Sequence, residues 1–374
     1  MLSDIFINIL IITAKALVAV LCFLLPLAAI NSWFERKVSA LIQDRVGANR
    51  SNIFGFDLAG IINTVLADPV KAFLKEDLIP QGVNKILHTL APILAALPVF
   101  MCVAVIPFGP PFEILGRTIT MQVANLNVAL LYIFAMGGLA IYGVILAGWV
   151  SNNKFSLLGS LRAVAQMMSY EVTLGLSVVG LICIYKTLDL NKIVLLQGGS
   201  FYGLPAWGIF LNPIAFFVFF AAAMAETRRA PFDVAEGESE IVAGYFTEYS
   251  GMKFILFWLG EFAEIVIVSA LIVLLFFGGW QVPYFDITTI PSDLWGVLPE
   301  WFNEVEFNWT PLVAWSVFIA KVIFFCVLQI VIRWTLPRFR YDQVMGLCWK
   351  ILLTVSILNF LLTVGLVLGG SYKI

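Results

Sequence analysis

The feature that most constrains the fold of this chain is a succession of apolar runs, each long enough to cross a lipid bilayer. A transmembrane helix needs about 20 apolar residues, because each residue adds about 1.5 Å along the helix axis. Such runs lie near residues 6–33, 86–107, 124–150, 164–186, 210–226, 254–278, 312–334 and 346–369. The sequence therefore predicts an all-α integral membrane protein with about eight transmembrane helices.

Composition narrows the class of protein. Of the 374 residues, 61% are hydrophobic and 12% are charged, which is typical of polytopic membrane proteins and unlike soluble domains. The five cysteines show no Cys-x-x-Cys spacing, so the sequence indicates no disulfide framework and no metal or iron–sulfur site. We expect no cofactor held covalently or by a motif, and the net charge of −2 gives no indication of nucleic acid as a partner.

The chain is predicted to form a single membrane domain, 1–374, with two substantial loops. The first loop, 34–85, contains apolar residues that share one face of a helix, with a kink or break expected at Pro69. We expect an amphipathic helix lying on the membrane surface there. The second loop, 227–253, is rich in acidic residues.

The lysines and arginines predict how the helices are oriented. Of the 22 such residues, sixteen fall on the side of the two long loops, and two, Lys15 and Lys321, lie inside apolar runs. The other side carries four, namely Arg117, Lys186, Lys192 and Lys373. By the positive-inside rule, both long loops face the cytoplasm and both termini lie outside.

Carboxylates are concentrated around the second loop. Those in or before it are Glu226, Asp233, Glu236, Glu238 and Glu240. A charge run is usually a solvated loop, but Glu261 lies about 12 Å beyond Lys253 in the next helix, with Glu264 on the same face. A carboxylate at that depth is costly unless it is paired, protonated or hydrated. The pattern therefore favours proton handling over a solvated loop.

Glu171, in the fourth apolar run, is a further carboxylate inside apolar sequence. It follows a stripe of polar residues at four-residue spacing, formed by Arg162, Gln166 and Tyr170. Since an isolated carboxylate inside a membrane helix is costly, we expect a functional role for Glu171, with Glu226 as a possible neighbour.

The end of the first run is basic, with Arg36, Arg45 and Lys71 near the expected surface helix. One interpretation is a basic anchor on the membrane surface. The other is the mouth of a site that admits an amphiphile from the bilayer. The residues alone leave both open.

Several motifs together resemble those of one known family. They are Glu35-Arg-Lys37, Ser151-Asn-Asn153, Leu161-Arg-Ala-Val-Ala-Gln-Met-Met-Ser-Tyr-Glu-Val172, Ala225-Glu-Thr-Arg-Arg-Ala-Pro-Phe-Asp233, Glu236-Gly-Glu-Ser-Glu240, Glu248-Tyr-Ser-Gly251 and Pro337-Arg-Phe-Arg-Tyr-Asp-Gln343. This set resembles the H-type membrane subunit of bacterial NADH-quinone oxidoreductase, the counterpart of chain 1 of mitochondrial complex I. The resemblance covers the chain from Glu35 to about Lys350.

The resemblance implies a membrane subunit of proton-pumping NADH:quinone oxidoreductase, with quinone as substrate. Its partners would be the lipid bilayer, the quinone-module subunits of the peripheral arm and small membrane-arm subunits. The quinone chamber would include Glu35, Arg36, Arg45 and Lys71. A proton path would include Glu171, Glu226, Asp233, Glu236, Glu238, Glu240 and Glu261. The resemblance also favours a multi-pass protein of the bacterial inner membrane over one of the mitochondrial inner membrane.

This chain also departs from the family pattern. Arg228 stands where the family usually has asparagine, so it adds a positive charge beside Glu226. Ala48 replaces a usual proline, and Pro69 falls within the expected surface helix. Two alternatives stay open. One is the equivalent subunit of a membrane-bound hydrogenase or ferredoxin-using complex, and the other is a stand-alone ion transporter.

Overall fold

A computed structural model describes residues 2–49, 52–53, 56–57, 60–61, 63–114, 117–201, 203–235, 237, 241–284 and 310–370. Seven helical stretches in these ranges are long and apolar enough to cross a bilayer. They are Ile9–Ile42, Lys85–Val105, Ala129–Val150, Lys154–Tyr185, Gly251–Phe276, Thr310–Thr335 and Tyr341–Leu368. The prediction of an all-α membrane protein is confirmed.

The individual elements follow in chain order. The first stretch joins α1 (Leu2–Val18), the π-helical segment η1 (Ala19–Leu24) and α2 (Leu25–Ile42). The next helices are α4 (Lys85–Cys102) with the 3₁₀ turn η3 (Val103–Val105), α5 (Ala129–Val150), α6 (Lys154–Tyr185), α7 (Leu190–Gln197), α11 (Gly251–Phe276) and α13 (Thr310–Thr335). The last stretch joins α14 (Tyr341–Gly346), the π-helical segment η7 (Leu347–Leu352) and α15 (Leu353–Leu368).

The fifth predicted span is a shorter helix, α9 (Pro213–Glu226), preceded by one turn, α8 (Gly208–Leu211). The break falls at Asn212, whose side chain accepts a hydrogen bond from the backbone N–H of Ala215 at 3.1 Å. Pro213 occupies the first turn of α9, where its missing N–H costs no helical hydrogen bond. Glu226 is therefore the last residue of a 14-residue apolar helix.

The first loop holds a hairpin of β1 (Asn52–Ile53) and β2 (Phe56–Asp57), then the π-helical segment η2 (Asn63–Ala67) and α3 (Asp68–Leu74). Instead of breaking at Pro69, the helix changes from π to α geometry at Asp68, so proline stands in the first turn of α3. Large apolar side chains along this segment are exposed, namely Ile61, Val65, Leu66, Val70, Phe73 and Leu74. That exposure fits the predicted amphipathic helix.

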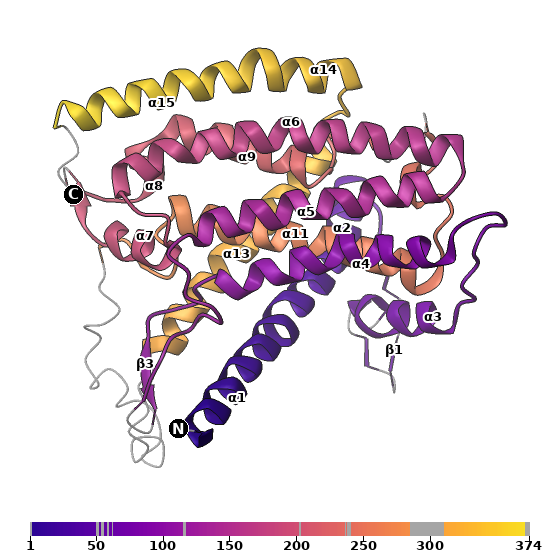
Figure 1. The fold of residues 1–374 in the computed structure, drawn as a ribbon, viewed down its shortest axis with the longest axis horizontal. Helices are drawn as coiled ribbons and strands as arrows, with labels where there is room; N and C mark the ends of the chain where they lie inside the picture. The colour runs from indigo at the N-terminus through magenta and orange to yellow at the C-terminus, as the bar shows by residue number, and fades with distance from the viewer. Residues whose placement is uncertain are drawn as a thin grey trace.

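Two further antiparallel hairpins connect the helices, β3 (Phe112–Ile114) with β4 (Arg117–Ile119) and β5 (Ser200–Phe201) with β6 (Leu204–Pro205). Figure 1 shows α4, α5, α6 and α11 side by side, while α1 leaves this bundle at a steep angle. The start of α1 and the end of α15 lie toward the same end of the molecule, opposite α3 (Figure 1).

The centre of the bundle is α11, which packs against α4, α2, α13 and α9. In its most apolar 18-residue window, 89% of the residues are buried, so its polar side chains face protein and not lipid. The two long loops meet at its start, where Lys253 Nζ lies 2.8 Å from Asp77 Oδ2 and Ser250 Oγ donates to the Glu76 carbonyl at 3.1 Å. The acidic loop and the surface-helix loop therefore share one end of the molecule.

Candidate functional site

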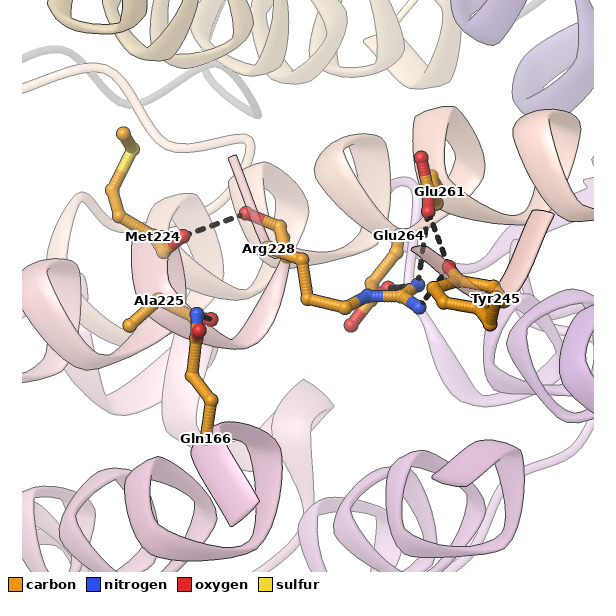
Figure 2. Close-up of polar contacts among 8 residues, drawn as sticks. Gln166, Met224, Ala225, Arg228, Tyr245, Glu261 and Glu264 are labelled. Atoms are coloured by element: carbon orange, nitrogen blue, oxygen red, sulfur yellow. Dashed lines mark hydrogen bonds and ion pairs between the residues drawn. The ribbon is translucent and has the colours of Figure 1, made fainter. Parts of the chain in front are cut away.

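The candidate site is organised by the turn that follows α9. Gln166 of α6 is fully buried, and its side-chain amide donates to the carbonyls of Ala225 and Phe232, each at 2.7 Å (Figure 2). Thr227 Oγ1 donates to the Met224 carbonyl at 3.1 Å. Because a buried carbonyl without a partner is costly, these bonds hold the turn in one position. The side chains on either side of the turn are fixed with it.

Arg228 extends from this turn into the bundle. Its Nη2 lies 3.5 Å from Glu261 Oε1 and 3.6 Å from Glu264 Oε2, both on α11 (Figure 2). Its Nη1 donates to the hydroxyl of Tyr245, in the 3₁₀ turn η4 (Gly244–Phe246), and that hydroxyl donates to Glu261 Oε1 at 2.8 Å. One guanidinium therefore serves two buried carboxylates.

Glu226 and Glu171 lie against two consecutive glycines of α5. A Cβ added to Gly137 would meet Glu226 Oε1 at 3.4 Å, and one added to Gly138 would meet Glu171 Oε1 at 3.1 Å. Since glycine has no side chain, carboxylates from α9 and α6 reach the same short stretch of α5. This juxtaposition brings together two residues that lie 55 positions apart in the sequence.

Two small cavities adjoin Glu226, Glu261 and Glu264. One, of about 40 Å³, is lined by Glu226 and Glu264 among apolar side chains, and the other, of about 10 Å³, by Glu261, Glu264 and Arg228. A space of about 10–15 Å³ is the minimum that holds one water molecule. Glu264 borders both cavities, so water-sized spaces link these carboxylates. We call Glu171, Glu226, Glu261 and Glu264 the carboxylate cluster.

Arg229 contacts a different carboxylate. Its Nη1 donates to Glu35 Oε2 at 2.8 Å, and Nη1 of Arg333, from α13, lies 2.5 Å from Glu35 Oε1. The guanidinium of Arg229 also stacks over the ring of Phe262, 4.2 Å from its centroid. All three charged side chains are at most 22% exposed. We call Glu35, Arg229 and Arg333 the Glu35 network.

The other residues predicted for the quinone chamber lie at the surface. Arg36 Nη2 lies 2.6 Å from Asp68 Oδ2, which joins α2 to α3. Arg45 Nε donates to Gln43 Oε1 at 2.7 Å, and Lys71 is exposed in the last turn of α3. The structure therefore buries Glu35 and leaves the three cations exposed.

A cavity of about 570 Å³ lies elsewhere, between α1, the β3–β4 hairpin and α13. Its lining is almost entirely apolar, and Lys15 contributes the charged group, with Nζ 3.2 Å from Thr120 Oγ1. None of the four residues predicted for the quinone chamber lines it. Within the described ranges, no group of three or more His, Cys, Asp or Glu side chains is placed to hold a metal ion.

Asp233 was predicted for the same path as Glu226 and Glu261. The structure pairs it with Arg338, and this ion pair ties the acidic loop to the segment after α13. Its place in the path stays a prediction. Glu236, Glu238 and Glu240 lie outside the described residues.

Sequence reasoning did not assign roles to Tyr245, Glu264 or Arg333. Glu264 carried a signal, since it shares a helical face with Glu261, whereas the hydroxyl of Tyr245 and the reach of Arg333 depend on tertiary packing. Lys321 lies inside an apolar run, and its Nζ donates to the carbonyls of Phe277, Gly279 and Gln281 at 2.6–2.9 Å.

Taken together, the fold and the buried charges define a polytopic helical membrane protein with a carboxylate cluster inside it. Residues 14–364 match the NADH dehydrogenase family. The chain belongs to that family.

Relatives named as the H subunit of NADH-quinone oxidoreductase are similar over nearly the whole chain. One from Geobacter sulfurreducens is 43% identical, and the match covers 91% of each chain. One from Thermomicrobium roseum is 42% identical, again over 91% of each, and one from Cytophaga hutchinsonii is 40% identical over 92% of this chain and 93% of its own.

Proposed function

We propose that this chain forms the membrane side of a quinone chamber in an NADH:quinone oxidoreductase and couples quinone reduction to proton translocation through its carboxylates. The names of its relatives support the first half of the proposal. The observation that carries the second half is the turn after α9, where consecutive residues contact the carboxylate cluster and the Glu35 network. Quinone-side chemistry and proton-binding groups are thereby joined by one rigid segment.

The quinone side consists of the Glu35 network and the exposed cations near it. Reduction of a quinone to a quinol takes up two electrons and two protons, and the electrons come from a redox partner in the peripheral arm. Because Arg36, Arg45 and Lys71 are exposed, a peripheral-arm subunit docked on α3 would enclose them. Their positive charge favours binding of the polar head of a quinone as it gains electrons.

The proton side consists of the carboxylate cluster. Glu226, Glu264 and Glu261 are separated by spaces of water size, so a proton can pass between them by way of water. A unit charge placed about 8 Å away changes the free energy of ionisation of a carboxyl group by about 2 kcal/mol at an effective dielectric of about 20. A tenfold change in a protonation equilibrium needs only about 1.4 kcal/mol. Quinone reduction nearby is therefore sufficient to draw a proton into the cluster.

The proposed role implies the partners and the location of the protein. The partners are the peripheral-arm subunits of the quinone module, small membrane-arm subunits and lipid, and quinone is the substrate. The protein resides in the bacterial inner membrane as a multi-pass subunit. The chain alone, reconstituted in liposomes, transports no ions, whereas a stand-alone transporter would.

The test replaces Glu226 by glutamine in the assembled complex. Glu226→Gln keeps the size of the side chain and removes its ability to ionise, so quinone reductase activity and coupled proton pumping should fall at least about tenfold. Membrane vesicles are assayed for NADH-driven quinone reduction and for acidification with a fluorescent pH probe. Glu76→Gln, at an exposed position, is the matched control and retains activity. Normal rates of both processes in Glu226→Gln would remove this residue from the mechanism.

A further inference from the structure

The buried position of Arg228 needs an explanation. Its side chain is only 7% exposed, and its backbone has φ = 54°, a left-handed conformation that is unfavourable for a residue with a Cβ. Burying a guanidinium is also costly unless its charge is matched. The hydrogen bonds from Gln166 to the two ends of the turn hold this conformation in place. Several favourable contacts are therefore needed to hold a cation at this point of the fold.

The cation lies where carboxylates outnumber it. Within the described part of the chain, Glu261 and Glu264 contact Arg228 directly, and Glu226 faces Glu264 across the cavity of about 40 Å³. Two carboxylates therefore contact one guanidinium, and a third borders the cavity next to them. If all were ionised, the cluster would carry excess negative charge in a buried site, so the number of protons it holds depends on whether the guanidinium is present.

Other ionisable groups face α11 from the helices around it. They are Cys102 of α4, Glu171 of α6 beyond Glu226, Tyr245 of η4, and the Glu35 network with Glu35 of α2 and Arg333 of α13. At one end of α11, Lys253 contacts Asp77 and His88, and at the other Lys321 contacts three backbone carbonyls. Arg229 pairs with Glu35 and also lies near enough to act on Glu264, whereas the guanidinium of Arg228 contacts both Glu261 and Glu264 directly.

We propose that Arg228 is a positioning residue that sets the charge of the carboxylate cluster, and thereby the pH range over which quinone reduction is coupled to proton translocation in this protein. The proposal rests on the proposed function and adds to it a role for Arg228. Tyr245 fixes the geometry, because its hydroxyl accepts from Arg228 and donates to Glu261. Glu264 is a carboxylate whose negative charge is balanced by the positive charge of Arg228.

The experiment changes the charge of the cluster in two ways and measures activity against pH. Arg228→Gln removes the cation, so the cluster binds its protons more tightly, and the pH profile of quinone reduction in assembled membranes should move about one to three units upward. The double variant Arg228→Gln, Glu264→Gln removes one charge of each sign. Because it restores the net charge of the cluster, its profile should return toward that of the unmodified protein. Arg228→Lys should also retain the original profile.

Controls separate this effect from loss of folding and from failure of the proposed function. Lys192→Gln removes an exposed cation paired with Asp189, and its profile should match that of the unmodified complex. The amount of assembled complex is measured for every variant. An unshifted profile in Arg228→Gln, or an equal shift in the single and double variants, would overturn the proposal. Absence of quinone reductase activity from the unmodified complex would instead refute the proposed function.

Discussion

The two sites reached by Arg228 and Arg229 have opposite charge balance. In the Glu35 network two guanidiniums share one carboxylate, whereas in the carboxylate cluster one guanidinium is shared by two carboxylates with a third nearby. Consecutive residues thus connect a cation-rich site to an anion-rich one. A cation-rich site favours a substrate that gains negative charge, and an anion-rich site favours uptake of protons. Under the proposed function, the two halves of the coupled reaction would therefore lie at these two places.

Lys321 is a second, partly buried cation, and its partners differ from those of Arg228. Lys321, near the other end of α11, donates to three backbone carbonyls and lies 4.7 Å from the ring centroid of Trp207. These bonds tie Lys321 to the loop that follows α11. Arg228 contacts two carboxylates, whose charge depends on protonation, and this difference is the reason that we propose a coupling role for Arg228 and not for Lys321.

The largest expected effect comes from Glu35. Glu35→Gln leaves two mostly buried guanidiniums without their carboxylate, which typically costs about 3–5 kcal/mol. The assembled complex should therefore be scarce in membranes and should lose activity, as measured by native electrophoresis and by quinone reductase assay. Glu35→Asp keeps the charge and should assemble. Full assembly of Glu35→Gln would contradict the charge balance assigned to the Glu35 network.

An intermediate effect is expected from Gly138. In Gly138→Ala the new methyl group lies about 3.1 Å from Glu171 Oε1, so the carboxylate must move by a few tenths of an ångström. Coupled proton pumping should fall severalfold. Gly137→Ala is the matched control, since its methyl group lies at an ordinary 3.4 Å from Glu226 and both changes gain about 1 kcal/mol of helix propensity. Equal pumping in the two variants would remove Glu171 from the carboxylate cluster.

The smallest effect on stability is expected at the surface. The Arg36–Asp68 pair is partly exposed, with side chains 43% and 36% accessible, so it contributes at most about 1 kcal/mol. Arg36→Ala should leave the amount of complex unchanged and raise the KM for quinone severalfold. Asp68→Asn breaks the same pair but keeps the cation, and should raise KM less. If Arg36→Ala lowers only the amount of complex, the residue is a membrane anchor.

Much of this architecture could be predicted from the sequence. Apolar runs of membrane length specify helices because lipid leaves no other partner for the backbone, and the depth of Glu261 in such a run already marks it as unusual. The short helix α9 was also expected to be the shortest span. These features depend on neighbouring residues only.

The partners of the charges could not be predicted in the same way. Glu35 and Arg229 lie 194 residues apart, and Gln166 holds carbonyls 59 and 66 residues away. Asp233 pairs with Arg338, 105 residues further along the chain. Helical periodicity describes the face of one helix, whereas these contacts depend on how several helices pack.

The most direct test of the central claim is whether a carboxylate of the cluster changes its protonation when quinone is reduced. Reduction-induced infrared difference spectra of the assembled complex record the C=O stretch of protonated carboxyl groups, which shifts in D₂O. We predict a carboxyl band that appears on quinone reduction in the unmodified complex and is lost in Glu226→Gln, while Glu76→Gln retains it. A spectrum of Glu226→Gln identical to that of the unmodified complex would contradict the account.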